Sequence, residues 1–124
     1  MNAMRDQIAY HLVPEPWFTA QPGDRSYLPE SFDREGFVHL THGIEPVIAA
    51  GNRYYRSDPR PYLVLTVDLA SVTAEVRYED PVRQFPHVYG PIDREAILTV
   101  QRVVRDGDGT FLGVAQEDEW NQQD

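Results

Sequence analysis

Runs of apolar residues, some continuous and some alternating with polar ones, predict several short β-strands. The run at 62–69, Tyr-Leu-Val-Leu-Thr-Val-Asp-Leu, is almost entirely apolar and rich in β-forming residues. Such a run is typical of a central strand buried on both faces. Residues 8–13 predict a first strand that ends at Pro14. The alternating residues 75–79 predict a strand with one exposed face.

Short helices are predicted mainly in the first half of the chain. Residues 14–20 favour a helix with proline in its first turn, and 28–36 favour a second short helix that Gly36 closes. A strand at 37–41 follows that glycine directly. Apolar residues recur at helical spacing in 44–55, which therefore predicts the longest helix.

The second half ends in a predicted hairpin. Residues 80–91 contain three prolines and predict a structured surface loop, and 92–96 predict one helical turn. Strands at 97–105 and 110–115 flank Asp106-Gly-Asp-Gly109, a sequence that indicates a tight turn.

These elements predict one domain of the α+β class, because helices come early and strands dominate late. We expect residues 1–106 to form the domain core. We expect residues 107–124 to add a C-terminal hairpin strand and an acidic, frayed tail.

Composition excludes several kinds of chemistry. The 124 residues contain neither cysteine nor lysine, so a thiolate nucleophile, a thiolate zinc site and a lysine Schiff base are all excluded. The net charge of −9 argues against broad nucleic-acid binding, which requires many phosphates to be neutralised. The sequence has neither a secretory signal pattern nor an apolar run of about 18 residues, so we expect a cytoplasmic protein without a membrane partner.

The four histidines are the best candidates for chemistry near neutral pH. His11 and His39 fall in predicted strands, and His87 falls in Phe85-Pro-His-Val-Tyr-Gly-Pro91. In an extended segment, His87 and Tyr89 point to the same side, where an imidazole and a phenol form a wall for a planar ligand. The alternative for each histidine is a half-buried ring that is hydrogen-bonded to backbone, and the alternative for Tyr89 is core packing.

A metal site is the rival interpretation. His39 and His42 are three residues apart, a spacing that suits a helix, but they face opposite ways in the predicted strand. The sequence has no His-Glu-x-x-His pattern and no Gly-x-Ser-x-Gly turn. We therefore expect neither a bound metal nor a serine hydrolase, and we set His42 aside as structural.

Several segments together resemble the DUF 952 family, a domain family of unknown function. They are Tyr10-His-Leu12, Trp17, Gly36-Phe-Val-His-Leu-Thr41, Tyr78-Glu79 and the Phe-Pro-His-x-Tyr-Gly-Pro loop, within about 8–104. The resemblance implies an ADP-ribosyltransferase-like fold, with split antiparallel β-sheets around an NAD-binding cleft and short helices on the N-terminal side. The strands that carry His11 and His39 are also similar to the catalytic half of tRNA 2′-phosphotransferases.

The resemblance implies a cleft for NAD or a related small nucleotide, with ADP-ribosyl transfer or NAD hydrolysis as its activity. NAD is then a substrate, and no tightly bound cofactor is expected. By the same similarity His11 holds the nicotinamide-side ribose, and Arg53 or Arg56 falls in the place of a family arginine.

Chemistry at the ribose also requires a carboxylate, for which Glu79 is the candidate, and the alternative for Glu79 is an exposed carboxylate at the end of a strand. The expected catalytic residues are His11, Glu79 and His87. The expected nucleotide-binding residues are His39, Thr41, Tyr89, Gly90 and Trp17. The alternative function is a non-catalytic small-molecule binding module on the same fold.

Overall fold

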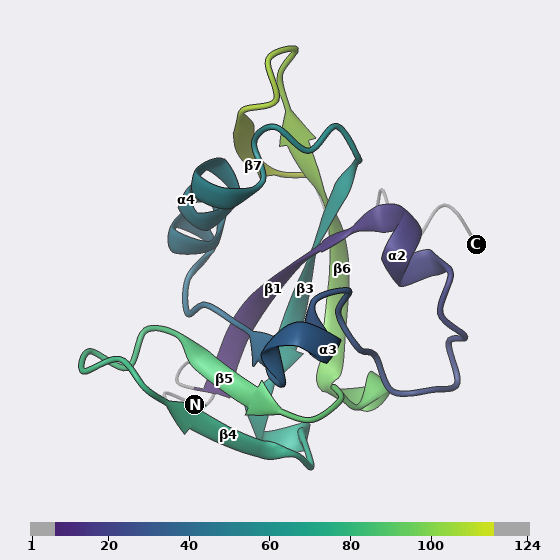
Figure 1. Cartoon of the computed structure of the whole chain (residues 1–124), viewed down its shortest axis with the longest axis vertical. Helices are drawn as coiled ribbons and strands as arrows, with labels where there is room; N and C mark the ends of the chain where they lie inside the picture. Colours follow the sequence, from purple (N-terminus) through teal and green to yellow (C-terminus); the bar gives the residue numbers. More distant parts are fainter. Residues whose placement is uncertain (1–6, 116–124) are drawn as a thin grey trace.

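The computed structural model describes residues 7–115 of the chain. Two antiparallel β-sheets meet at an angle, and short helices lie around them (Figure 1). A four-stranded sheet forms the long axis of the molecule, and a three-stranded sheet lies across one end of it. The prediction of an α+β domain with antiparallel sheets and few short helices is confirmed at this level.

The larger sheet is built around the apolar strand that the sequence predicts to be central. Its strand order is β1-β3-β6-β7, and all neighbours are antiparallel. The strands are β1 (Ile8–Pro14), β3 (Tyr62–Asp68), β6 (Ile97–Arg105) and β7 (Phe111–Val114). Residues 62–65 and 67 of β3 are buried, because this strand has a partner on each edge and packed side chains on both faces.

The smaller sheet has the order β2-β5-β4. Its strands are β2 (Val38–His39), β5 (Pro86–Tyr89) and β4 (Glu75–Tyr78). The prediction that 80–91 is a loop throughout is therefore wrong for β5, which is the central strand. Proline is tolerated as the first residue of a strand, and Pro86 occupies that position. Val38 and Val88 pair and are fully buried, so the alternation places His39 and His87 on the opposite face.

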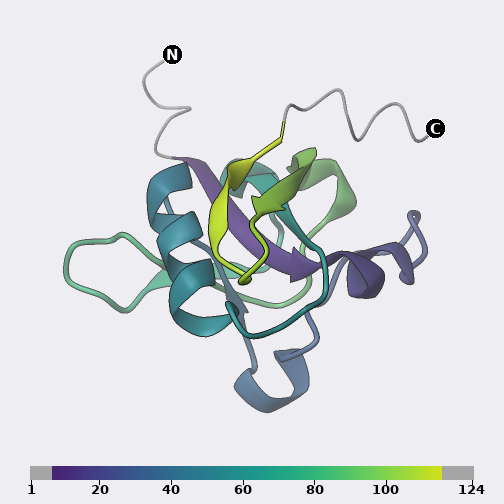
Figure 2. The ribbon, with the colours of Figure 1, turned by 90° about the horizontal axis from the view of Figure 1, so that it is seen from above.

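The helices are short, as predicted. They are α2 (Glu15–Thr19), α3 (Phe32–Glu35) and α4 (Ile44–Tyr54), with 3-10 turns η1 (Leu69–Ser71) and η2 (Arg94–Ala96). The predicted helix at 28–36 contains only α3, and Gly36 ends it with φ 78°. Seen from above, α4 lies beside β1 and β7, and α2 lies toward the other side of the sheet (Figure 2).

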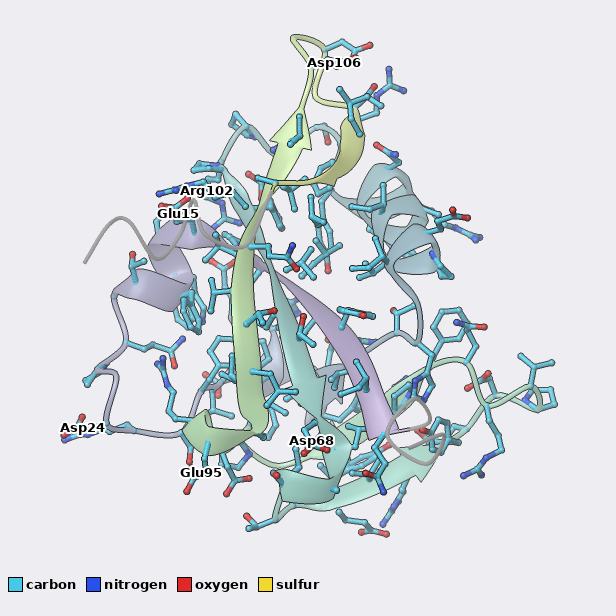
Figure 3. The ribbon with its side chains drawn as sticks, turned by 180° about the vertical axis from the view of Figure 1, so that it is seen from behind. Glu15, Asp24, Asp68, Glu95, Arg102 and Asp106 are labelled. Atoms are coloured by element: carbon cyan, nitrogen blue, oxygen red, sulfur yellow. The ribbon has the colours of Figure 1, made fainter. Side chains whose placement is uncertain are left out.

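Side chains close the gaps between these elements. Gly51 of α4 lets the Phe111 ring of β7 approach the helix, since a Cβ there would lie 2.5 Å from the ring. Asn52 donates to the Phe111 carbonyl (2.9 Å) and accepts from its N–H (2.6 Å). Seen from behind, Glu15 and Arg102 lie together where α2 meets β6, with Arg102 Nη2 3.4 Å from Glu15 Oε2 (Figure 3).

Strand β7 lies in the segment that the sequence predicts to follow the domain core, residues 107–124. Phe111 is only 2% exposed, so β7 belongs to the same packed body as α4. The predicted acidic tail, from residue 116 onward, lies outside the described residues. No helix among residues 7–115 has the length and apolar character required to cross a membrane.

Candidate functional site

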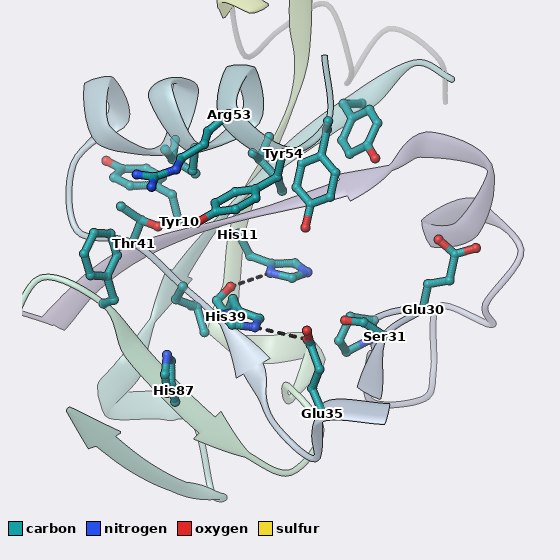
Figure 4. Close-up of a pocket in the computed structure, with 18 of the residues that line it drawn as sticks. Tyr10, His11, Glu30, Ser31, Glu35, His39, Thr41, Arg53, Tyr54 and His87 are labelled. Atoms are coloured by element: carbon teal, nitrogen blue, oxygen red, sulfur yellow. Dashed lines mark hydrogen bonds and ion pairs between the residues drawn. The ribbon is translucent and has the colours of Figure 1, made fainter. Parts of the chain in front are cut away.

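A cleft of about 1050 Å³ opens between α4, β1 and the smaller sheet (Figure 4). Strand β1 forms its floor, α4 forms one wall, and α3, β2 and β5 form the other. The five predicted site residues that line it are His11, His39, Thr41, Glu79 and His87. The cleft therefore collects residues that lie up to 76 positions apart in the sequence.

The two sheets are joined at the floor of the cleft. The N–H of Tyr10 donates to the Thr41 carbonyl, and the N–H of Thr41 donates to the Tyr10 carbonyl, each over 2.8 Å. This reciprocal bridge holds β1 against the end of β2. It fixes where the His11 side chain, next along β1, lies relative to His39.

His11 is buried and fully hydrogen-bonded within the protein. Its side chain is 2.7 Å from the His39 carbonyl through Nδ1 and 2.8 Å from the Tyr27 hydroxyl through Nε2. A carbonyl can only accept, so Nδ1 carries the proton and Nε2 accepts from Tyr27. Burial lowers the pKa of His11 to about 4, and the ring is therefore neutral at pH 7.

Glu79 connects two aromatic side chains of β5. His87 Nδ1 and the Tyr89 hydroxyl each lie 2.8 Å from the same oxygen, Glu79 Oε1. These hydrogen bonds, with that from His87 the stronger influence, lower the pKa of the Glu79 carboxyl below its usual value. Glu79 is thus a carboxylate at neutral pH, and both neighbours donate to it.

Phe37 packs against both histidines of the smaller sheet, His39 and His87. Its ring stacks on His87 with 4.2 Å between ring centres, and its centre lies 4.7 Å from that of His39. His39 and His87 sit opposite each other in the β2–β5 register, with their rings edge to face at 5.2 Å. His39 Nε2 donates to Glu35 Oε1 over 3.1 Å, a spacing of four residues that Gly36 makes possible by ending α3.

Charges around the cleft are unevenly paired. Arg60 binds Asp58 and Glu30, and the carboxylates of Glu35, Glu79 and Asp80 accept hydrogen bonds from side chains or backbone. Arg34 and Arg53 also line the cleft, and neither forms an ion pair with any residue in 7–115. Arg34 and Arg53 are therefore cations that a ligand can pair with, beside the carboxylates of Glu35, Glu79 and Asp80, which keep their negative charge.

Exposed aromatic rings stand at the rim of the same cleft. Tyr54 of α4 is 66% exposed, Tyr55 is 39% exposed and Phe85, just before β5, is 43% exposed. A group of exposed aromatic side chains beside a cavity is typical of a binding surface.

The remaining predicted residues lie outside the cleft lining. Tyr89 contacts the site through Glu79 and through the Phe37 ring, and Gly90 packs against Ala74, whose Cβ would be 2.7 Å from a Cβ at Gly90. The Trp17 indole N–H donates to the Leu28 carbonyl over 2.8 Å, away from the lining. His42 bonds the Ile8 carbonyl and the Tyr78 hydroxyl, which fits the structural role expected for it.

Sequence reasoning missed Arg34 and the exposed rings of Tyr54 and Phe85, and it left Arg53 as one of two choices. The only signal for Arg53 and Tyr54 was their place at the end of the long helix. No sequence signal marked Arg34. Within residues 7–115, no group of three or more histidine or acidic side chains is placed to hold a metal ion.

Comparisons with known proteins support the fold but indicate no activity. The crystal structure of protein CC0527 from Caulobacter crescentus is similar with a TM-score of 0.69 and 18% identity, over 92% of this chain and 98% of that one. The solution NMR structure of CC0527 gives a TM-score of 0.63 and 20% identity, over 92% and 96%. No curated protein sequence matches the chain. The model of the family described as "Protein of unknown function (DUF952)" matches residues 12–100, and the chain therefore belongs to the DUF952 family.

Proposed function

We propose that the cleft binds a small nucleotide of the NAD or ADP-ribose type, and that the two-sheet architecture is ADP-ribosyltransferase-like. Transfer or hydrolysis of the ADP-ribosyl group is the proposed reaction. A cytoplasmic location, without a broad nucleic-acid partner, is part of the same proposal. One observation carries this proposal. The cleft is lined by exposed aromatic rings and by two arginines that form no ion pair with any residue in 7–115.

The aromatic rings suit the flat parts of such a ligand. A nucleobase stacks on tyrosine or phenylalanine with a contribution of about 1–3 kcal/mol per base. Tyr54 and Phe85 stand on opposite walls of the cleft, one on α4 and one at the entry to β5. A planar ring bound there covers apolar surface that is otherwise in contact with water.

The arginines suit the pyrophosphate. A guanidinium binds phosphate oxygens through paired charge-assisted hydrogen bonds, which are stronger than bonds between neutral groups. Arg53 already lies against an aromatic ring, with its guanidinium carbon 5.6 Å from the centre of Tyr54. This pairing places one cation beside one stacking surface, which matches the alternation of phosphate and base in a nucleotide.

A non-catalytic binding module is the second candidate, and one observation favours it. Both ring nitrogens of His11 are bonded inside the protein, to the His39 carbonyl and to Tyr27. His11 therefore has no free nitrogen to hold a ribose, which is the role that the family resemblance implies for it. Under this candidate the cleft retains its affinity for nucleotides but does not catalyse a reaction.

Calorimetric titration with NAD, ADP-ribose and inorganic phosphate tests the proposed function. We expect NAD and ADP-ribose to bind and Arg53→Gln to weaken them about tenfold, the effect of losing roughly 1.4 kcal/mol of phosphate binding. Arg56→Gln is the matched control, because Arg56 lies just beyond the same helix but pairs with Asp108 outside the cleft. Absence of heat and of chemical-shift changes with both nucleotides would refute the proposal.

A further inference from the structure

The hydrogen bonds of His87 leave one ring nitrogen available. A carboxylate can only accept, so the 2.8 Å contact to Glu79 Oε1 requires a proton on Nδ1. The neutral ring then has an unprotonated Nε2. Among residues 7–115, no group forms a hydrogen bond with that nitrogen. His87 lines the cleft, so a bound molecule can use its lone pair.

The ring is also held in one orientation. Phe37 stacks on one face, with 25° between the ring planes, and His39 packs at its edge. Glu79 is itself fixed by the hydroxyl of Tyr89, which stands two residues along β5 on the same side. Because these contacts hold the ring in one orientation, little conformational entropy is lost when the ring accepts a proton from a bound molecule. A general base requires such a fixed position.

The other two cleft histidines are less suited to this role. His11 has both nitrogens bonded within the protein. His39 is bonded to Glu35 through Nε2, but its side chain is 53% exposed, compared with 18% for His87. His87 combines a free nitrogen, a fixed ring and partial shelter from water, and the others each lack one of these.

We propose that His87 is the catalytic proton acceptor of the cleft and that Glu79 is the positioning residue that orients it. This inference rests on the proposed binding of NAD. An O–H bond of water breaks, and its proton moves to His87 Nε2. The water oxygen bonds to the anomeric carbon of the ribose as the ribose–nicotinamide bond breaks. That electron pair leaves on nicotinamide, which becomes neutral, and ADP-ribose is the other product.

This assignment changes the expected role of Glu79. A carboxylate that stabilises positive charge at the sugar needs free oxygen lone pairs facing the sugar. Glu79 Oε1 accepts two hydrogen bonds from β5, and the bond from His87 Nδ1 fixes the tautomer of that ring, which is the positioning role proposed for Glu79. The arrangement follows the logic by which a buried carboxylate orients a catalytic histidine in hydrolases.

Nicotinamide release and NAD binding, measured separately on the full-length chain, test the inference. The Asn amide in His87→Asn reaches Glu79 from about the place of Nδ1 but has no counterpart of Nε2. We expect release to fall about 100-fold or more, with NAD affinity unchanged. Glu79→Ala should slow release about tenfold and convert His87 to mixed tautomers in ¹⁵N NMR. Glu95→Ala is the control, since Glu95 is an exposed glutamate on η2 and does not line the cleft.

The outcomes separate the two proposals. Failure of the native protein to bind NAD refutes the proposed function and this inference with it. Binding without nicotinamide release, or release that His87→Asn leaves intact, overturns the assignment of His87 and leaves binding standing. The tautomer in the native protein is a check that needs no variant, because a proton found on Nε2 of neutral His87 contradicts the inference directly.

Discussion

The buried His11 makes a quantitative prediction about acid stability. The ring is 6% exposed, neutral and bonded at both nitrogens, and burial lowers its pKa from 6.5 to about 4. In the unfolded chain the same ring takes a proton near pH 6.5. Stability from His11 is therefore complete above pH 6.5 and is lost as the pH falls from 6.5 toward 4.

The magnitude follows from the two pKa values. At pH 4.5 the unfolded state is almost fully protonated at this site, and the folded state is protonated only in a minority of molecules. At 1.36 kcal/mol per pKa unit, His11 accounts for a loss of about 2.5 kcal/mol in the free energy of unfolding between pH 7.5 and pH 4.5.

Urea unfolding of the native protein and His11→Asn at both pH values isolates this loss. The asparagine amide can still donate to the His39 carbonyl, but it does not titrate and leaves Tyr27 without its acceptor. We expect the variant to be less stable by about 1–3 kcal/mol at pH 7.5 and the gap to shrink by about 2.5 kcal/mol at pH 4.5. The carboxylates titrate alike in both proteins, so their contributions to the pH dependence cancel in the difference between the two free energies of unfolding. An unchanged gap would refute the reasoning, as would an NMR titration midpoint of His11 near 6.5.

Two further predictions concern the packing of α4 on β7. Gly51→Ala should lower the free energy of unfolding by about 1–2 kcal/mol despite its better helix propensity, because the new Cβ would meet the Phe111 ring at 2.5 Å. Gly23→Ala has open space and should change stability by less than about 0.5 kcal/mol in the same urea experiment. Asn52→Ala should cost about 1–3 kcal/mol and speed hydrogen exchange of the Phe111 amide, and an unchanged exchange rate would contradict the role given to Asn52.

The positions of most elements could be predicted from the sequence. Five strands begin and end within one residue of their predicted ranges: β1, β3, β4, β6 and β7. The pattern of apolar and polar residues that predicts a strand is local, and so are the proline and glycine signals that end a strand. Strand β5 was missed because three nearby prolines indicate a loop. Its pairing with β2 and β4 on both sides outweighs that local preference, since each partner supplies backbone hydrogen bonds.

The site was only partly predictable. The two-residue spacing of His87 and Tyr89 already places both rings on one side of an extended segment. It does not show that Glu79, eight residues before His87 and just beyond the end of β4, accepts a hydrogen bond from each. Such a contact depends on strand register, which no local pattern determines.

The sequence by itself therefore determined the strands, the helices and the residue types available for chemistry, because these depend on neighbours a few positions apart. The tertiary structure alone decided which of those residues share a cleft. Arg34 and Arg53 line the same cleft as His87 only when the Tyr10–Thr41 bridge joins the two sheets. The total free energy of side-chain burial and backbone hydrogen bonding selects that arrangement. The same arrangement buries His11 in the cleft floor, where its role is structural.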